Sequence, residues 1–511
     1  MSPISVRRCL VVAAVFALLV MSAIQPAAAQ MGGMMGGGMM GGGMGGMGGM
    51  GGGMGGMGGM GGGMGGGGMG MGGGGMGGGG MGGGGRGRAG GIVVDARGVV
   101  QPLMAKDVGG KLSEKRLAEL AGKFLPSDVN SFSKLRKVSL VRLEAACEEY
   151  ARTQKHVPAE MQYLAGVQRI DYVFIFPDTK DIVIAGPAEG FVADGAGRAT
   201  GVGTGRPPLR LDDLVIALRS LEAEREIGCS IDPVETNLAN LQNYLAANSD
   251  PADSATARAR FDDMAEVLGK QDVRVFGVPG DSHFAEVLVE ADYRMKRLTI
   301  GVDKPLVKGM KSHLSMIGPG TNTMQRWWFT PYYNAFRRSD DGLAFSFAGQ
   351  RVQLLAQEEM VEGGKRSDAA FTQLSTQRYA KLFTSKYPEL ASASRVFGEL
   401  QNLFDLSVLA ALLQKERAAE RVGWNRSLFL DPTRATIVKR NVPKQVQTLV
   451  NVKSSGNNLL IGLIAGGVII QPQQVLQQSP FQGDEGATLR TARTAAVQPE
   501  KPAEKHPWWW D

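Results

Sequence analysis

The chain has 511 residues, of which 43% are hydrophobic and 21% charged, and this composition excludes both a fully disordered chain and a polytopic membrane protein. Its 56 Lys and Arg against 49 Asp and Glu give a formal net charge of +7, with both signs mixed along the sequence. Because no stretch forms a basic patch, we expect no nucleic-acid partner. At ~150 residues per domain, two or three domains are expected.

Residues 1–29 have the order of a secretory signal peptide. Arg7 and Arg8 precede a short apolar run over 9–20, and Ala27-Ala28-Ala29 supplies the small residues that a signal peptidase reads. The run is too short to stay in a bilayer, so we expect cleavage before Gln30 and no transmembrane span in the mature chain. The predicted location is periplasmic, cell-surface or secreted.

From Met31 to Gly85 every residue is Met or Gly. Such a tract has almost no side chains that can build a core, so residues 30–90 are predicted to be a disordered spacer. A metal-binding role is the alternative, because thioether groups are soft ligands that suit Cu(I).

Residues 91–310 are predicted to form a mixed α/β body. Helical spacing of apolar residues alternates here with short β-branched runs, and Asp281 or Ser282 caps the last helix. The expected strands lie within 92–100, 171–176, 181–186, 227–232 and 273–278, and the expected helices at 112–122, 138–155, 211–221, 235–247, 255–268 and 284–298.

Residues 311–478 are predicted to form a β-rich and helical domain. Aromatic and β-branched residues dominate 327–361, with a hairpin turn at 340–342, and a helical pair follows at 370–415. Further strands are expected at 436–438 and 449–452, and Leu459–Ile470 is expected to turn as a hairpin at Gly466-Gly467. The fold class is therefore α+β: an α/β body, then a β-rich segment, a helical pair and a β-hairpin region.

The last segment, 479–511, is polar and contains Pro, so we expect a disordered tail with Trp508–Trp510 exposed. After removal of the leader, Cys147 and Cys229 are the remaining cysteines. In an oxidising compartment they form either one disulfide or two buried thiols, and the spacing does not decide between these.

Four stretches carry a resemblance to a known family. They are GPAEGF (Gly186–Phe191), GRPPLRLDDLVIALRSL (Gly205–Leu221), DSHFAEVLVEADYRMKRLTIG (Asp281–Gly301) and the block Trp327–Glu359. Together they resemble an uncharacterised family of large exported proteins from planctomycete-type bacteria, defined as a domain of unknown function. The resemblance covers most of 91–475 and is strongest in 272–360. It implies no active site, so it transfers no functional residue.

The enzyme signatures in the sequence each lack an essential member. Gly280-Asp281-Ser282-His283 resembles the nucleophile block of GDS-type esterases, but none of the four His has an Asp three residues before it. A helix cap is therefore the favoured interpretation of Ser282. The glycine-rich stretch 195–205 has no nucleotide-binding spacing, and no His/Cys cluster has zinc spacing. We predict no catalytic, cofactor-binding or metal-binding residue.

One aromatic run remains as a candidate binding element. Trp327, Trp328, Phe329, Tyr332 and Tyr333 are suited to a glycan-stacking platform, although alternation along a strand places about half of them in the core.

Three functions follow. We favour a non-enzymatic binding or structural component of the cell envelope, with an envelope or extracellular partner that the sequence does not identify. The alternatives are an extracytoplasmic hydrolase with a site near 281–333, involving Asp281, His283 or His313, and copper handling through the Met/Gly tract.

Overall fold

The computed structural model describes residues 89–94, 100–104, 111–233, 253–362, 365–479, 481–497 and 507–511, apart from gaps at 154, 195–196, 224, 318–323, 334, 369–371 and 456–457; between 234 and 252 it describes 237, 240, 243–244, 247–248 and 250. The leader and the Met/Gly tract therefore lie outside the described residues. Most of the expected helix 235–247 lies outside them as well. The described residues belong to one compact unit. At its N-terminal side, β1 (Ala89–Val94) pairs antiparallel with β2 (Val100–Met104), as predicted.

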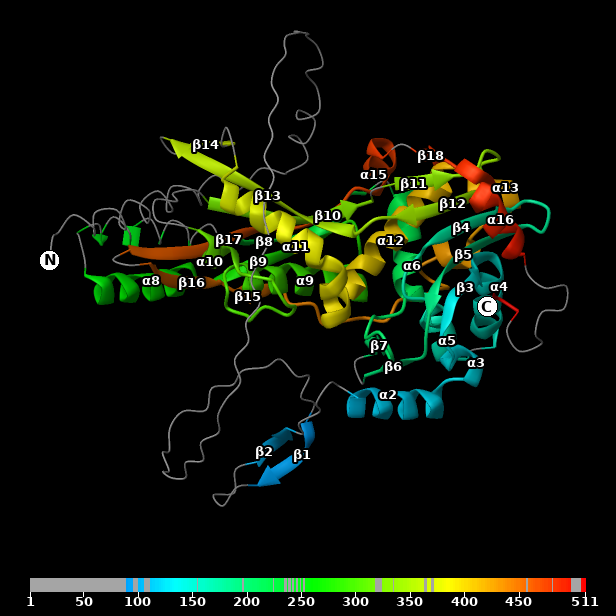
Figure 1. Cartoon of the computed structure of the whole chain (residues 1–511), viewed down its shortest axis with the longest axis horizontal. Helices are drawn as coiled ribbons and strands as arrows, with labels where there is room; N and C mark the ends of the chain where they lie inside the picture. The colour runs from blue at the N-terminus through cyan, green and yellow to red at the C-terminus, as the bar shows by residue number, and fades with distance from the viewer. Residues whose placement is uncertain are drawn as a thin grey trace, which may run out of the picture. The chain divides into compact units, whose positions relative to one another are not determined.

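One large sheet has eight strands, and β16 (Val450–Ser455) pairs with β17 beside the main path. The pair β10–β17 is parallel, and the other pairs are antiparallel. In spatial order the strands are β14 (Lys365–Asp368), β13 (Arg351–Glu362), β10 (Met324–Tyr332), β17 (Asn458–Ile470), β8 (Ile227–Pro233), β9 (Lys270–Phe276) and β15 (Gln445–Gln447) (Figure 1).

The second sheet has seven strands, of which β11 and β18 pair in parallel and the others antiparallel. In spatial order they are β18 (Phe481–Gly483), β11 (Ala335–Arg338), β12 (Ala344–Ala348), β4 (Tyr172–Phe176), β5 (Asp181–Ala188), β3 (Ser133–Ser139) and β19 (Trp509–Trp510). A separate two-stranded pair joins β6 (Phe191–Ala193) and β7 (Ala199–Gly201).

The chain does not divide at residue 310, where we expected a domain boundary. The eight-stranded sheet places β17 beside β8, and the seven-stranded sheet places β12 beside β4, so each sheet combines strands from both sides of that position. Local periodicity does not report such pairing, because strands far apart in sequence are joined only by tertiary contacts. The α+β fold class is confirmed.

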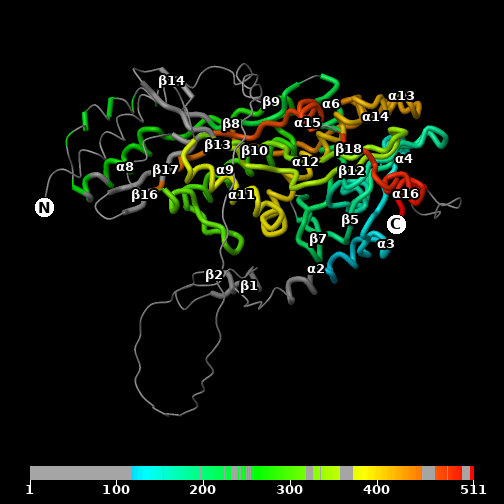
Figure 2. Tube along the Cα trace, turned by 45° about the horizontal axis from the view of Figure 1, so that its top comes forward, coloured from blue at the N-terminus to red at the C-terminus, as the bar shows by residue number. Residues whose placement is uncertain are grey.

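The helices pack around these sheets, and two short 3₁₀ segments, η4 (Leu164–Gly166) and η5 (Glu485–Ala487), accompany them. Figure 2 shows α9 and α11 on the same side of strands β8, β10 and β13. The helices are α2 (Lys111–Phe124), α3 (Ser127–Asn130), α4 (Leu140–Arg152), α5 (Ala159–Gln162), α6 (Leu211–Glu222), α8 (Ser254–Leu268), α9 (His283–Thr299), α10 (His313–Met316), α11 (Leu374–Ala393), α12 (Arg395–Lys415), α13 (Ala418–Val422), α14 (Ser427–Leu430), α15 (Pro472–Gln478) and α16 (Thr488–Ala495).

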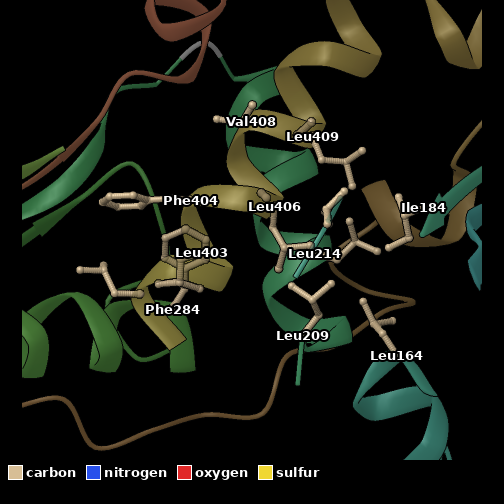
Figure 3. Packing of buried hydrophobic residues seen from close by; sticks show 14 of the residues in the cluster. Leu164, Ile184, Leu209, Leu214, Phe284, Leu403, Phe404, Leu406, Val408 and Leu409 are labelled. Atoms are coloured by element: carbon tan, nitrogen blue, oxygen red, sulfur yellow. The ribbon is translucent and has the colours of Figure 1, made fainter. Parts of the chain in front are cut away.

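Helix α12 is the centre of the core, and apolar residues on nearly every face are the pattern of a buried helix. Figure 3 shows Leu403, Phe404, Leu406, Val408 and Leu409 of α12 among buried residues of α6, α9, η4 and β5. Among the described helices, α12 is also the one long and apolar enough to cross a membrane, with a mean hydropathy of 1.4 in its best window. That window is completely buried inside the protein, as in the core helix of any globular protein, so it is weak evidence for a span.

Three expected local elements differ from the structure. Leu459–Ile470 is part of one continuous strand, β17, and not a hairpin. Its Gly466 is needed for close approach, because a Cβ there would lie 1.8 Å from the backbone oxygen of Trp327 on the neighbouring strand. The predicted helix from 138 begins at Leu140 because β3 precedes it, and 436–438 is not a strand.

The expected disordered, exposed tail is wrong for the described residues 481–497 and 507–511. Residues 481–483 form β18, and α16 follows. Trp508 and Trp509 are only 2% and 5% exposed, because β19 adds to the edge of β3. Two indole rings offer enough apolar area to dock a segment whose surroundings in sequence are polar.

Cys147 lies in α4 and Cys229 in β8, and both are buried thiols, which settles the alternative left open by the sequence. Burial and the neighbouring Glu144 raise the pKa of Cys147 to about 12, so this thiol is unreactive at neutral pH.

Candidate functional site

The first candidate is the N-terminus of α9, where the sequence places Asp281, Ser282 and His283 directly after β9. Ser282 is 1% exposed, and its hydroxyl accepts a hydrogen bond from the Ala285 N–H at 3.1 Å. The same hydroxyl donates to the Pro279 carbonyl at 2.6 Å. The predicted helix cap is confirmed, and the proton that a nucleophile would give to a base is held by a backbone carbonyl.

His283 is buried between two carboxylates from different helices. Its Nδ1 lies 2.9 Å from Asp213 Oδ2 on α6, and its Nε2 lies 3.5 Å from Glu399 Oε1 on α12. Burial alone would lower the pKa of His283, but Asp213 and Glu399 outweigh it and raise the pKa to about 9. The imidazole is therefore protonated at neutral pH, a state in which it cannot act as a general base.

Arg198, just before β7, extends this network. Its Nε donates to Glu399 Oε1 at 3.2 Å, and its terminal nitrogens pair with Glu399 and with Glu290 of α9. Burial would raise the pKa of Glu399, yet His283 and Arg198 lower it to about 2. Two cations thus alternate with three carboxylates, of which Glu290 is partly exposed, so that each buried charge faces one of opposite sign.

The network joins elements that are distant in sequence: α6, α9, α12 and the segment before β7. We name Arg198, Asp213, His283, Glu290 and Glu399 the buried charge network. Its polar atoms face each other, which is typical of a structural connection between helices. Sequence analysis identified His283 but none of its partners. One signal was available: Glu399, like Asp405, is an acidic residue of a helix with apolar residues on nearly every face, and a buried carboxylate requires a partner.

His313, the other histidine considered for a site near 281–333, lies in different surroundings on α10. Its Nε2 is 3.2 Å from the Thr376 hydroxyl, and its ring centroid lies 5.1 Å from that of Trp327 and 5.7 Å from that of Tyr379. Burial lowers the pKa of His313 to about 4, so the ring is neutral at physiological pH. It packs as an aromatic core residue, with one polar contact.

The second candidate is the aromatic run on β10, and the structure divides it as alternation predicts. Trp327, Phe329 and Tyr333 are 0%, 0% and 4% exposed and belong to the core. Trp328 is half-buried on the opposite face of the strand, and Tyr332 is 38% exposed.

The outward part of this run has defined neighbours. Leu355 of β13, which is 39% exposed, lies directly opposite Trp328 in the strand pair. The Arg326 guanidinium lies over the Trp328 ring at 5.5 Å. We name Arg326, Trp328, Tyr332 and Leu355 the β10 outer face. It combines aromatic and aliphatic area with a cation, which is the composition of a contact surface.

Within the residues that the structure describes, no group of three or more His, Cys, Asp and Glu is arranged to hold a metal ion. The methionines of 31–85 lie outside that part of the chain. The copper hypothesis therefore stays a prediction.

Comparison with known proteins gives a partial match. None of the curated proteins and none of the solved structures matches the chain. Residues 229–313, which run from β8 through α9 to α10, match the model of a family described as a protein of unknown function, DUF1598. The expected resemblance to a domain of unknown function is confirmed over these residues.

Proposed function

We propose that this protein is an exported, non-enzymatic binding protein of the cell envelope, and that it binds envelope glycans through the β10 outer face. The observation that carries the proposal is that half-buried Trp328 and exposed Tyr332 of β10 lie on the strand face opposite the core, with exposed Leu355 of the neighbouring β13 beside Trp328. Export rests on the signal-peptide order of residues 1–29, and the resemblance to exported planctomycete-type proteins agrees with it.

The use of the polar groups near α9 supports a non-enzymatic role. A serine hydrolase needs a hydroxyl whose proton points to a neutral base. Here the Ser282 proton goes to the Pro279 carbonyl, and His283 is an imidazolium held by Asp213. Both groups serve the fold in this arrangement.

The composition of the β10 outer face favours a sugar over a protein core segment as its ligand. A pyranose ring has an apolar C–H face that stacks on indole or phenol, and hydroxyls that take hydrogen bonds from neighbouring polar groups. Trp328 and Tyr332 supply the rings, and Arg326 supplies donors beside them. Aromatic residues with a polar end are suited to such contacts, which are partly exposed to solvent.

Co-sedimentation tests this proposal, with insoluble peptidoglycan, chitin and cellulose as probes. The full chain is expected to bind at least one of them, and Trp328→Ala and Tyr332→Ala are each expected to weaken that binding at least tenfold. Phe132→Ala is the matched control, because Phe132 is 64% exposed and lies outside the β10 outer face. Absence of binding to all three probes, or equal binding by all variants, would refute the proposed surface.

The hydrolase alternative has its own readout. A fluorophosphonate probe is expected to leave the protein unlabelled. Stoichiometric labelling that disappears in Ser282→Ala would replace the binding proposal with a hydrolase.

A further inference from the structure

The last five residues, 507–511, occupy the edge of the seven-stranded sheet as an added strand. Trp509 pairs with Val138 and Trp510 with Lys137 of β3, and the Ser139 N–H donates to the Trp508 carbonyl at 2.8 Å. Trp508 and Trp509 are buried, although only two residues have strand pairing. Side chains therefore contribute much of the recognition.

Arg136 of β3 is the centre of that recognition. Its side chain is fully buried. Nη1 donates to the carbonyls of Val129 at 3.0 Å and Ala165 at 2.7 Å. Nη2 donates to the carbonyls of Asp128 at 3.0 Å and Ser131 at 3.1 Å. These carbonyls belong to α3, η4 and the turn before β3, so the guanidinium is held independently of the tail. Such a fixed fork is prepared for a carboxylate.

The tail provides that carboxylate and covers the fork. Asp511 accepts hydrogen bonds from Arg136 Nε at 2.8 Å and Nη2 at 3.0 Å. The Arg136 guanidinium lies over the Trp509 ring, 4.6 Å from its centroid. The Arg142 guanidinium lies 5.9 Å from the centroid of the Trp510 ring. Partial burial would raise the pKa of Asp511, but hydrogen bonds from Arg136 and Ser133 lower it, so the pair is ionised at neutral pH.

We propose that the groove formed by β3, Arg136 and Arg142 is a recognition site for an extended Trp-Trp-Trp-Asp segment, and that a second copy of this chain supplies the segment by strand exchange. Every copy carries the identical residues 508–511, so the contacts made within one chain can be made between two. No covalent bond changes in this exchange: one β19 leaves the groove and another enters.

Chain length determines which arrangement prevails. Nine residues, 498–506, connect the last residue described before the gap to Pro507. A short connection gives an effective concentration on the order of millimolar for the chain's own tail. Exchange in the intact protein therefore requires a high local protein concentration, whereas a copy with a defective tail has an empty groove that accepts a partner's tail at much lower concentration.

Complementation between two defective copies tests the proposal. The acceptor carries Trp509→Ala and Asp511→Ala, which disable the tail, and the donor carries Arg136→Met, which disables the groove. At micromolar concentration each alone is expected to sediment as a monomer, and their mixture as a 1:1 dimer. Arg152→Met in place of Arg136→Met is the matched control, because Arg152 is an exposed arginine of α4 and leaves the groove intact. A mixture of folded donor and acceptor that remains monomeric overturns the proposal.

A second measurement is independent of whether the donor folds. A fluorescent peptide with the sequence of residues 506–511 is titrated into the acceptor. Saturable binding is expected, together with at least tenfold weaker binding of the peptide that has Ala in place of Asp511. Equal binding of the two peptides, or no binding of either, also overturns the proposal.

Discussion

The pKa of His283 makes the stability of the protein depend on pH, and this dependence tests the buried charge network. The ring is protonated in the folded protein up to pH about 9, whereas an ordinary histidine loses its proton near pH 6.5. The folded state therefore holds a proton that the unfolded chain releases between these values. At about 1.4 kcal/mol per pH unit, protonation of His283 contributes about 3 kcal/mol to stability, fully present below pH 6.5 and lost as pH rises through 9.

His283→Gln removes this titration. Urea denaturation of the full chain and the variant is measured below pH 6.5 and above pH 9. The variant is expected to be less stable by about 3 kcal/mol at the lower pH, because Asp213 and Glu399 lose the cation between them, and the difference is expected to shrink at the higher pH. His156→Gln, at an exposed position, is the control and is expected to show no such trend. A difference that is the same at both pH values would refute the assignment of His283 as a buried imidazolium.

Three further predictions concern the helix cap, the second buried histidine and the N-terminal tract. Ser282→Ala is expected to lower the free energy of unfolding by ~1 kcal/mol, while Ser282→Asp stays close to wild type in the same urea titration, because Asp also caps. His313 is neutral in the fold and has a pKa of about 4, so stability should fall as pH decreases from 6.5 to 4, and His313→Phe should flatten that part of the pH profile. A chain that starts at Arg88, without Met31–Gly85, is expected to melt cooperatively at about the full-length temperature, and a large loss of stability would contradict a spacer role.

Elements with a clear local pattern were predicted well from the sequence. The hairpin of β4 and β5 follows from two β-branched runs around turn residues, and α9 follows from helical spacing after the Ser282 cap. The burial of α12 follows from its apolar residues on all faces. In each case the signal lies within about twenty residues of sequence, which is the range over which periodicity is informative.

The errors have a common cause, which is contact between distant segments. Gly466-Gly467 resembles a turn, but the glycines allow β17 to lie close against Trp327 of β10. The tail resembles a solvated terminus, but Trp509 and Asp511 find Arg136 at the start of the folded chain. The local sequence pattern of either segment contains no information about the distant residues that it contacts. A prediction from that pattern therefore makes the glycine pair a turn and the tail a solvated segment.

The two candidate sites differ in whether their functional groups face the interior or the surface of the protein. Asp281, Ser282 and His283 are polar residues that follow one another after a strand, yet the charged partners of His283, Asp213 and Glu399, lie in two other helices. In the aromatic run, by contrast, alternation along β10 leaves Trp328 and Tyr332 on the side away from the core.

Polar and charged groups that find their partners inside a protein stabilise its fold, whereas groups that remain at the surface are available to a binding partner. The buried charge network belongs to the first kind: each of its ionised groups faces an opposite charge from another element. The β10 outer face belongs to the second kind. The groove around Arg136 has properties of both, because its cation is buried and fixed by backbone carbonyls while its anion comes from the short segment 507–511, which the proposed exchange would release. Residues 507–511 supply the carboxylate partner of Arg136 and part of its cover, so loss of the segment would open the guanidinium to water and leave it without that carboxylate. Under the proposed strand exchange, residues 507–511 of a second copy would restore both the cover and the counter-charge, which is why the donor and acceptor variants are expected to pair.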